Sequence, residues 1–372
     1  MARTAMVRWT AWIAGVLVLG LLAAWIWWRE SHTAARWRFE DAMEAYCGGL
    51  LAYEKSSLFE GMSPRMELPH DYDLGPDAHY CLLGGFTGTE VTVARLGPDQ
   101  YQFRDVGRRL LPPFRGSLLP VPLTGGWRGA ADGKSVGVLL SCRGKEDFVS
   151  VTVGSYRRQN GSDEEEVRQK QMNGWLDADL YWARFATATA VKAAARWDCK
   201  AEEGEVLRTL PPVTGPEETI GANGTCAGLP FTRDKRLDTI HETVASGSAL
   251  YERCEVEASH YFDDRYTFSA RFGPSAPRKR DQDMSHDIRE NAGADGNALW
   301  ASARCPGDTE RALFTGYVPP EAATVWLPGE KGKETFGLPA FREFAERSAK
   351  RHGCTDLRLP TVKRGAVDGR RQ

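Results

Sequence analysis

The feature that most constrains this chain is its set of eight cysteines, which falls into two groups with the same spacing. In each group a short interval is followed by two longer ones. The groups are Cys47, Cys81, Cys142 and Cys199, then Cys226, Cys254, Cys305 and Cys354. A cysteine spacing that occurs twice in one chain predicts two related domains.

The residues around the cysteines repeat as well. Matching stretches occur after the first and third cysteine of each group, and a pentapeptide recurs between the second and the third. The matched stretches are 47–50 with 226–229, 142–144 with 305–307, and ARLGP at 94–98 with ARFGP at 270–274. We therefore predict an internal duplication.

An even number of cysteines in two matched groups is typical of disulfides formed in an oxidising compartment. A zinc site would need closely spaced cysteine pairs, and the sequence contains none. Buried, reduced cysteines are the alternative. Four cysteines allow three pairings in each domain. We favour first with second and third with fourth, which gives Cys47–Cys81, Cys142–Cys199, Cys226–Cys254 and Cys305–Cys354.

Residues 9–28, WTAWIAGVLVLGLLAAWIWW, contain no charged side chain and have tryptophans near both ends. Twenty helical residues span about 30 Å, the thickness of the hydrocarbon core of a bilayer. Tryptophan favours the boundary between headgroups and hydrocarbon. We predict an uncleaved transmembrane helix, since the apolar region of a signal peptide is shorter. The disulfides then place the later domains outside the cell membrane.

The fold class predicted from these patterns is α+β, with an antiparallel sheet and a C-terminal helix in each repeat. In the first repeat, a strand at 91–96 and a hairpin at 135–156 precede a helix at 167–197. In the second, the same order predicts strands at 266–272, 298–305 and 311–318 and a helix at 338–352. The predicted organisation is a cytoplasmic tail 1–8, the anchor 9–28, a polar stalk 29–38, the first repeat 39–204, a proline-rich linker 205–221, the second repeat 222–360 and a disordered tail 361–372.

Two stretches resemble a hydrolase motif and a metal site, but each lacks the flanking structure or spacing that such a site requires. Residues 133–137 match Gly-x-Ser-x-Gly, but a nucleophile elbow needs a strand before the serine, and a glycine-rich loop precedes Ser135. A group of histidines and aspartates surrounds Gly75-Pro76, where aspartate supports turns, and it matches no metal motif. Its members are His70, Asp71, Asp73, Asp77 and His79, with His260, Asp263 and Asp264 after Cys254. We predict no catalytic, cofactor or metal site from these residues.

Two tryptophans beyond the anchor stand beside glycine or proline, where an exposed ring is expected. Trp127 and Trp326 are therefore predicted contributors to a contact surface. The net charge of −2 argues against nucleic acid as a partner.

In its anchor, its arginine-rich composition and its duplication, the chain resembles membrane-anchored envelope proteins of actinobacteria. That resemblance identifies no functional residue. The expected function is a non-catalytic binding or structural module of the cell envelope, with a protein, peptide or polysaccharide ligand between the domains. The alternatives are an exported hydrolase that uses Ser135 or His79 and a membrane-tethered sensor. A tail of eight residues before Trp9 is short for a signalling domain.

Overall fold

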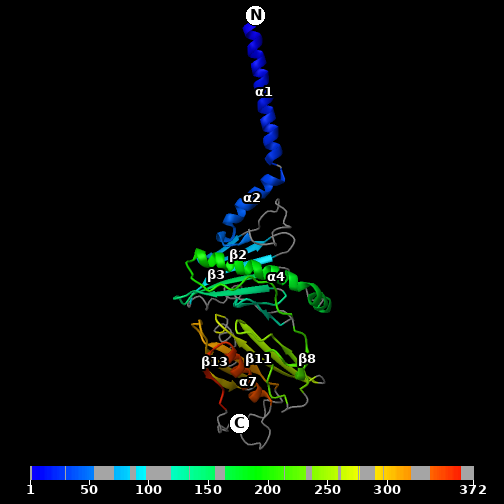
Figure 1. The fold of residues 1–372 in the computed structure, drawn as a ribbon, viewed down its shortest axis with the longest axis vertical. Coiled ribbons are helices and arrows are strands. Elements are labelled where there is room, and N and C mark those ends of the chain that lie inside the picture. Colours follow the sequence, from blue (N-terminus) through cyan, green and yellow to red (C-terminus); the bar gives the residue numbers. More distant parts are fainter. Residues whose placement is uncertain are drawn as a thin grey trace, which may run out of the picture.

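The two groups of cysteines correspond to two antiparallel β-sheets, each with a helix on one face (Figure 1). The structure is a computed structural model. It describes residues 2–29, 31–53, 71–83, 89–97, 119–133, 135–155, 164–212, 214–231, 237–258, 261–274, 276, 290–295, 297–319 and 336–361. Only the backbone is described for 2–11, 13, 14, 32, 73, 155, 164–179, 258 and 261–264. A mixed α+β fold is therefore confirmed.

The first sheet has seven strands in the order β1-β2-β3-β7-β6-β5-β4. Helix α4 (Glu164–Arg196) follows the last of these strands and packs on β6 and β7. The strands are β1 (Asp71–Gly75), β2 (Ala78–Leu83), β3 (Thr89–Leu96), β4 (Val121–Pro122), β5 (Gly129–Ala131), β6 (Ser135–Ser141) and β7 (Phe148–Ser155).

The second sheet has the order β12-β13-β14-β11-β10-β9-β8, and β15 (Thr355–Arg358) pairs with β13. Helix α7 (Gly337–Arg351) follows β14 in the chain and contacts β11, β13 and β14. The strands are β8 (Glu217–Glu218), β9 (Thr239–Glu242), β10 (Tyr251–Ala258), β11 (Tyr261–Arg271), β12 (Gly293–Asp295), β13 (Ala298–Arg304) and β14 (Ala312–Tyr317).

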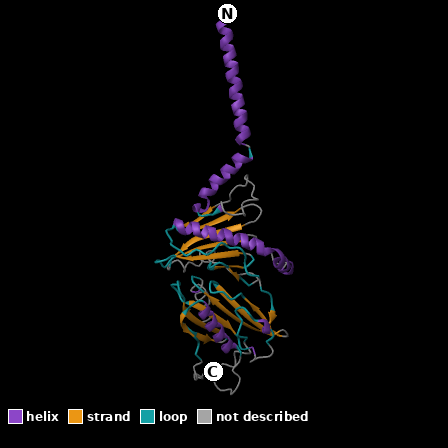
Figure 2. Ribbon diagram, viewed as in Figure 1, coloured by secondary structure: helices purple, strands orange, loops and turns teal. Residues whose placement is uncertain are grey.

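The two sheets share one topology, as an internal duplication predicts. The order β1-β2-β3-β7-β6-β5 in the first corresponds strand for strand to β9-β10-β11-β14-β13-β12 in the second. In both, the covering helix follows a hairpin (β6–β7 or β13–β14) in chain order. Figure 2 shows a helix lying across each sheet. The sheets differ at their edges, because β4 extends the first beyond β5 and β8 extends the second beyond β9.

The registers show how the two cores differ. Across four strands, the row of paired residues through Cys81 continues in the first sheet with Val91, Val153 and Val136. The corresponding row through Cys254 continues with Phe268, Gly316 and Leu299. A Cβ atom on Gly316 would lie 2.8 Å from Cδ2 of Phe341 on α7. A helix phenylalanine thus occupies the space that a strand valine fills in the first sheet.

The recurring pentapeptides lie in corresponding strands but one residue out of register. Ala94 pairs with Ala78, three positions before Cys81, whereas Ala270 pairs with Glu252, two positions before Cys254. Because side chains alternate between the faces of a strand, a shift of one residue reverses the face. Ala270 accordingly lies in the core under α7, whereas Ala94 packs with Leu139 on the opposite face of its sheet. The match that suggests duplication is therefore not a match of equivalent side chains.

The amino-terminal region is helical through most of the segment predicted as a polar stalk. Helix α1 (Ala2–Arg29) projects away from the sheets, and α2 (His32–Ala45) leads towards the first sheet (Figure 1). The hydroxyl of Ser31 accepts a hydrogen bond from Ala34 N, which begins α2. The short helix η1 (Tyr46–Gly49) then delivers Cys47 to the core. Among the residues whose side chains the structure describes, which leave out 2–11, 13 and 14 of α1, no helix is long and apolar enough to cross a membrane.

The proline-rich segment 205–221 is not a free linker. Leu207 is buried in the first core, and Arg184 Nε donates a hydrogen bond to its carbonyl oxygen at 2.8 Å. Further along the chain, β8 joins the edge of the second sheet through Glu217 and Glu218. The segment is therefore divided between the two repeats. The predicted disordered tail 361–372 lies outside the described residues apart from Thr361.

The exchange of volume between Gly316 and Phe341 generates a prediction. Gly316→Val should destabilise the second repeat by about 1–3 kcal/mol, because overpacking a close-packed core forces side chains out of position. Urea unfolding of the oxidised protein measures this change. Tyr317→Val on the same strand is the matched control, since Tyr317 is 46% exposed. The double variant Gly316→Val/Phe341→Leu should recover part of the loss. Equal stability of Gly316→Val and Tyr317→Val would show that Phe341 does not depend on the space left by Gly316.

Candidate functional site

The structure does not bring the two candidate residues of the hydrolase hypothesis together. Ser135 is buried at the start of β6, and its Oγ lies 3.1 Å from Oδ1 of Asp132, which also accepts a hydrogen bond from Ser135 N. His79 lies on β2, and strands β3 and β7 separate it from β6. Three strand spacings amount to about 14 Å, too far for a nucleophile and its base. Gly133 and Ser135 thus belong to a turn that Asp132 stabilises.

The predicted histidine and aspartate group divides between a strand and a turn. Asp71 and Asp73 lie on β1, and the β1–β2 turn contains Asp77. His70 and His260 lie outside the described residues, and the side chains of Asp73, Asp263 and Asp264 are not described. Cys47, Asp71 and Cys81 come close enough to hold a metal ion. The two sulfur atoms, however, are bonded to each other in a disulfide, so neither offers a thiolate.

The interpretation of Trp127 as an exposed contact residue is wrong. Trp127 is 5% exposed, and its Nε1 donates a hydrogen bond to the carbonyl oxygen of Glu205 at 2.6 Å. The segment that follows the first repeat passes over the indole ring, and a Cβ atom on Gly204 would lie 2.5 Å from that ring. Trp326 lies outside the described residues.

All eight cysteines form disulfides, with the connectivity favoured from the sequence. In each repeat one bridge ties the segment before β1 or β9 to the strand β2 or β10, and the other ties the hairpin to a residue beyond the covering helix. The bridges are Cys47–Cys81, Cys142–Cys199, Cys226–Cys254 and Cys305–Cys354.

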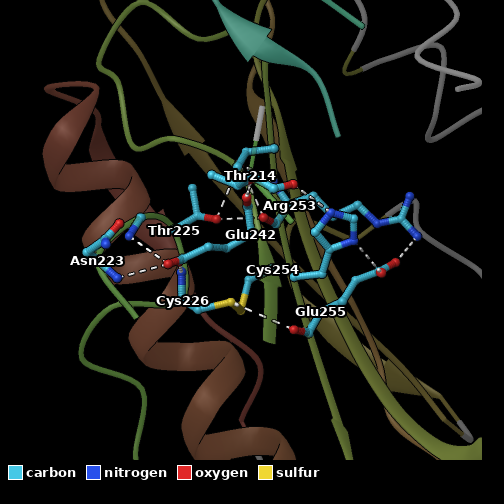
Figure 3. Close-up of a disulfide and its surroundings, with 11 residues drawn as sticks. Thr214, Asn223, Thr225, Cys226, Glu242, Arg253, Cys254 and Glu255 are labelled. Atoms are coloured by element: carbon cyan, nitrogen blue, oxygen red, sulfur yellow. Dashed lines mark hydrogen bonds and ion pairs between the residues drawn. A yellow bond between two sulfur atoms is a disulfide. The ribbon is translucent and has the colours of Figure 1, made fainter. Parts of the chain in front are cut away.

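A carboxylate stands beside the first bridge of each repeat, exposed at Asp71 and buried at Glu242, and neither was predicted from the sequence. Glu242 on β9 pairs in register with Cys254, and its Oε2 accepts a hydrogen bond from Cys226 N at 2.5 Å (Figure 3). Asp71 on β1 pairs with Cys81, and its Oδ2 accepts one from Cys47 N at 2.7 Å. The signal in the sequence is an acidic residue one strand before the second cysteine of each group.

Glu242 holds the whole loop that enters the second repeat. Its Oε1 also accepts hydrogen bonds from Asn223 N at 2.9 Å and Gly224 N at 2.8 Å (Figure 3). The residue is 3% exposed, so three backbone donors replace the water that a carboxylate otherwise binds. The carboxylate therefore fixes the position of Cys226 independently of the sulfur bond.

The residues of both repeats meet at a cleft of about 480 Å³. One wall is the β6–β7 turn of the first repeat, at 143–146. Facing it are Pro306, Gly307 and Thr309 of the corresponding β13–β14 turn in the second repeat. The cleft thus lies between the two turns that carry the third cysteine of each group, and a ligand between the domains was predicted from the sequence.

An ion pair joins the repeats beside this cleft, which Arg128 lines. Nη2 of Arg128 lies 2.8 Å from Oδ1 of Asp308, whose side chain is 1% exposed. Oδ2 of Asp308 also accepts a hydrogen bond from Gly273 N at 3.1 Å. Since a buried carboxylate is costly without partners, these contacts favour the docked arrangement.

The rim of the cleft carries exposed charges of both signs. Arg143 pairs with Glu202, and Lys145 lies 3.6 Å from Asp198, counted between Nζ and Oδ2. Glu146 and Asp147 also line the cleft. Such pairs are weak in water, so a ligand with both acidic and basic groups can replace them at little cost. The cleft suits a polar or zwitterionic ligand better than a polyanion.

A second hollow, of about 600 Å³, lies within the first repeat. It is lined by the end of α2 and by the last turns of α4, with Glu44, Lys192 and Arg196 as its charged residues. Nζ of Lys192 already donates a hydrogen bond to the carbonyl oxygen of Leu51 at 2.9 Å. Because the cleft between the repeats draws on both of them, it is the stronger candidate.

A buried charged cluster fastens α7 to the second sheet. The carboxylate of Glu252 on β10 accepts hydrogen bonds from Ser348 Oγ at 2.6 Å and Arg351 Nε at 2.9 Å. His352 Nε2 lies 3.1 Å from the same carboxylate. Burial alone would raise the pKa of Glu252, but the hydrogen bonds and charges of His352 and Arg351 outweigh it. They lower the pKa from its ordinary value of 4.5 to about 2.

The pKa of Glu252 predicts a pH dependence of stability. A folded-state pKa below the unfolded value contributes stability above pH 4.5, which is lost as the pH falls towards about 2. The contribution is about 3 kcal/mol. Urea unfolding should show Glu252→Gln to be less stable than the wild type at pH 7, with a difference that shrinks by pH 3. Glu343→Gln, in an exposed pair with Arg347, should leave the pH profile unchanged.

Glu242 supports a separate prediction. Glu242→Gln should lower the midpoint of thermal unfolding of the oxidised protein by several degrees, because the amide nitrogen would face backbone N–H donors. Glu257→Gln, on the neighbouring strand and 30% exposed in its side chain, is the control and should change the midpoint little. A wild-type midpoint in Glu242→Gln would show that the sulfur bond alone positions Cys226.

Comparison of the chain with protein-family models, with curated proteins and with solved structures finds no match. Function is therefore inferred from the disulfide-bonded fold and from the residues that line the cleft.

Proposed function

We propose that this protein is a membrane-anchored, non-catalytic binding module of the cell envelope and that its ligand occupies the cleft between the repeats. The observation that carries this proposal is the cleft itself, which has a volume of about 480 Å³ and is lined by two corresponding turns, one from each repeat. A peptide or protein segment with charges of both signs fits its rim best, and an envelope polysaccharide is the other ligand class.

The cleft supports binding more than turnover. The serine that lines it, Ser141, accepts a hydrogen bond from Arg128 Nη1 at 3.1 Å, and no histidine among the described residues lines the cleft to act as a base. Cys142, which also lines it, is bonded to Cys199. Ser135, the serine of the Gly-x-Ser-x-Gly stretch, is held in a turn by Asp132 and does not line the cleft. The exported hydrolase is therefore the weaker proposal.

Four disulfides indicate an oxidising, extracytoplasmic environment. What supports the proposed anchor is the charge-free stretch 9–28 within the single helix α1 of 28 residues. Such a helix is about 42 Å long and exceeds the hydrocarbon core of a bilayer. Its large apolar side chains are exposed, among them Leu19 at 68% and Trp27 at 75%. A bilayer around α1 would cover these side chains.

Photocrosslinking in intact envelopes tests the proposal. A photoreactive residue at Thr309, in the cleft, should give a crosslinked adduct, discrete for a protein ligand and diffuse for a polysaccharide. The same residue at Ile220, which is 92% exposed and does not line the cleft, should give none. Adding Arg143→Glu should reduce the yield at Thr309 by about three- to tenfold, because the reversed charge repels the acidic groups of the ligand. Equal yields at Thr309 and Ile220 would refute the cleft as the binding site.

A further inference from the structure

The junction between α1 and α2 carries a cluster of exposed arginine and tryptophan side chains, which we call the collar. All are exposed, including Trp28 at 45% and Trp37 at 55%. The collar consists of Trp28, Arg29, Arg36, Trp37 and Arg38.

The junction is held by specific contacts. The hydroxyl of Ser31 donates a hydrogen bond to the carbonyl oxygen of Trp28 at 2.5 Å and accepts one from Ala34 N at 3.2 Å. The rings of Trp28 and Trp37 meet edge to face, with centroids 5.8 Å apart. Helix α2 therefore leaves α1 in a defined direction (Figure 1).

These contacts place the collar at the level where α1 ends. Nη2 of Arg38 donates a hydrogen bond to the carbonyl oxygen of Arg29 at 3.0 Å. Arg29, in the last turn of α1, also lies over the ring of Trp25, 5.4 Å from its centroid. Both cations thus stand at the carboxyl end of α1, where free carbonyl groups favour positive charge.

The charges of α2 are separated along its axis. Arg36 and Arg38 belong to its first half, and Glu40, Asp41 and Glu44 to its second. At 1.5 Å per residue, Glu44 lies about 12 Å beyond Arg36. Arg36 pairs with Glu40 at 2.8 Å, but both are exposed, and such pairs contribute little in water. The positive end of α2 is the end next to α1.

We propose that the collar binds anionic phospholipid headgroups at the membrane in which α1 is anchored. This inference rests on the proposed anchor. With residues 9–28 in the hydrocarbon core, Trp28 lies at its boundary, where indole rings are favoured. The guanidinium groups of Arg29, Arg36 and Arg38 then reach the headgroup layer, where each strengthens attraction to an anionic surface by roughly fivefold. The acidic half of α2 points away from that surface.

Hydrogen exchange of the full-length protein in nanodiscs tests the proposal. One set of nanodiscs contains phosphatidylcholine alone, and the other adds about 30 mol % phosphatidylglycerol. Amide exchange in residues 32–40 should be about three- to tenfold slower in the anionic set. Arg36→Gln/Arg38→Gln should abolish that difference. The control Arg347→Gln/Arg358→Gln removes two exposed arginines from the second repeat, one of them from a matching i,i+4 pair, and should preserve it.

The outcomes separate the two proposals. If α1 is protected in both sets while residues 32–40 exchange equally in both, the collar does not bind anionic lipid and the anchor stands. If α1 exchanges freely in both sets, the anchor and the collar fail together. A lipid-dependent difference that persists in Arg36→Gln/Arg38→Gln would also overturn the assignment to these side chains.

Discussion

The disulfide between the helix end and the hairpin is the constraint on which each repeat depends. In the first repeat, α4 places five alanines and one phenylalanine, Phe185, in the core, and the bridge Cys142–Cys199 ties the residues after α4 to the β6–β7 hairpin. On the chain-entropy model, closing a loop of this size stabilises the fold by about 4 kcal/mol. In the second repeat, α7 places two phenylalanines, Phe341 and Phe344, in the core, and Cys305–Cys354 fastens this shorter helix. The two repeats thus share this disulfide, while the apolar side chains that their helices place in the core differ.

The two cores conserve volume instead of sequence. Three valines line the Cys81 row of the first sheet, whereas the Cys254 row has a glycine that leaves room for Phe341. Hydrophobic cores tolerate such exchanges when total volume and the in-out pattern are kept. The carboxylates beside the first bridges also differ, since the exposed Asp71 accepts a hydrogen bond from one cysteine N–H and the longer, buried Glu242 reaches three backbone donors. Each repeat reaches the same topology with its own side chains.

This divergence explains what could be predicted from the sequence. The cysteine spacing is the same in both repeats because a bridge needs both of its cysteines. The duplication, the disulfide pairing and the covering helices could therefore be predicted from the sequence. The two pentapeptides suggest equivalent positions but differ by one residue in register, since the sequence match does not reveal which face of a strand is buried. Strand β10, YERCEVEA, was missed because its Glu252 and Glu255 are charged yet buried. Trp127 was misassigned because Glu205, its hydrogen-bond acceptor, lies far along the chain. The sequence predicted that a ligand site lies between the domains but not which residues line it, because residues far apart in the chain form the cleft.

The cleft itself arises from a difference between the equivalent turns. Lys145 and Asp308 each stand three residues after the third cysteine of their group, and each backbone N–H closes the same turn onto that cysteine's carbonyl oxygen. Lys145 is on the rim of the cleft, while Asp308 is buried against Arg128 of the other repeat. A lysine at the position of Asp308 would face the guanidinium group of Arg128 and would repel it. With opposite charges at one repeated position, the second turn docks on the first repeat and the first turn remains open, which leaves a charged cleft between two related folds.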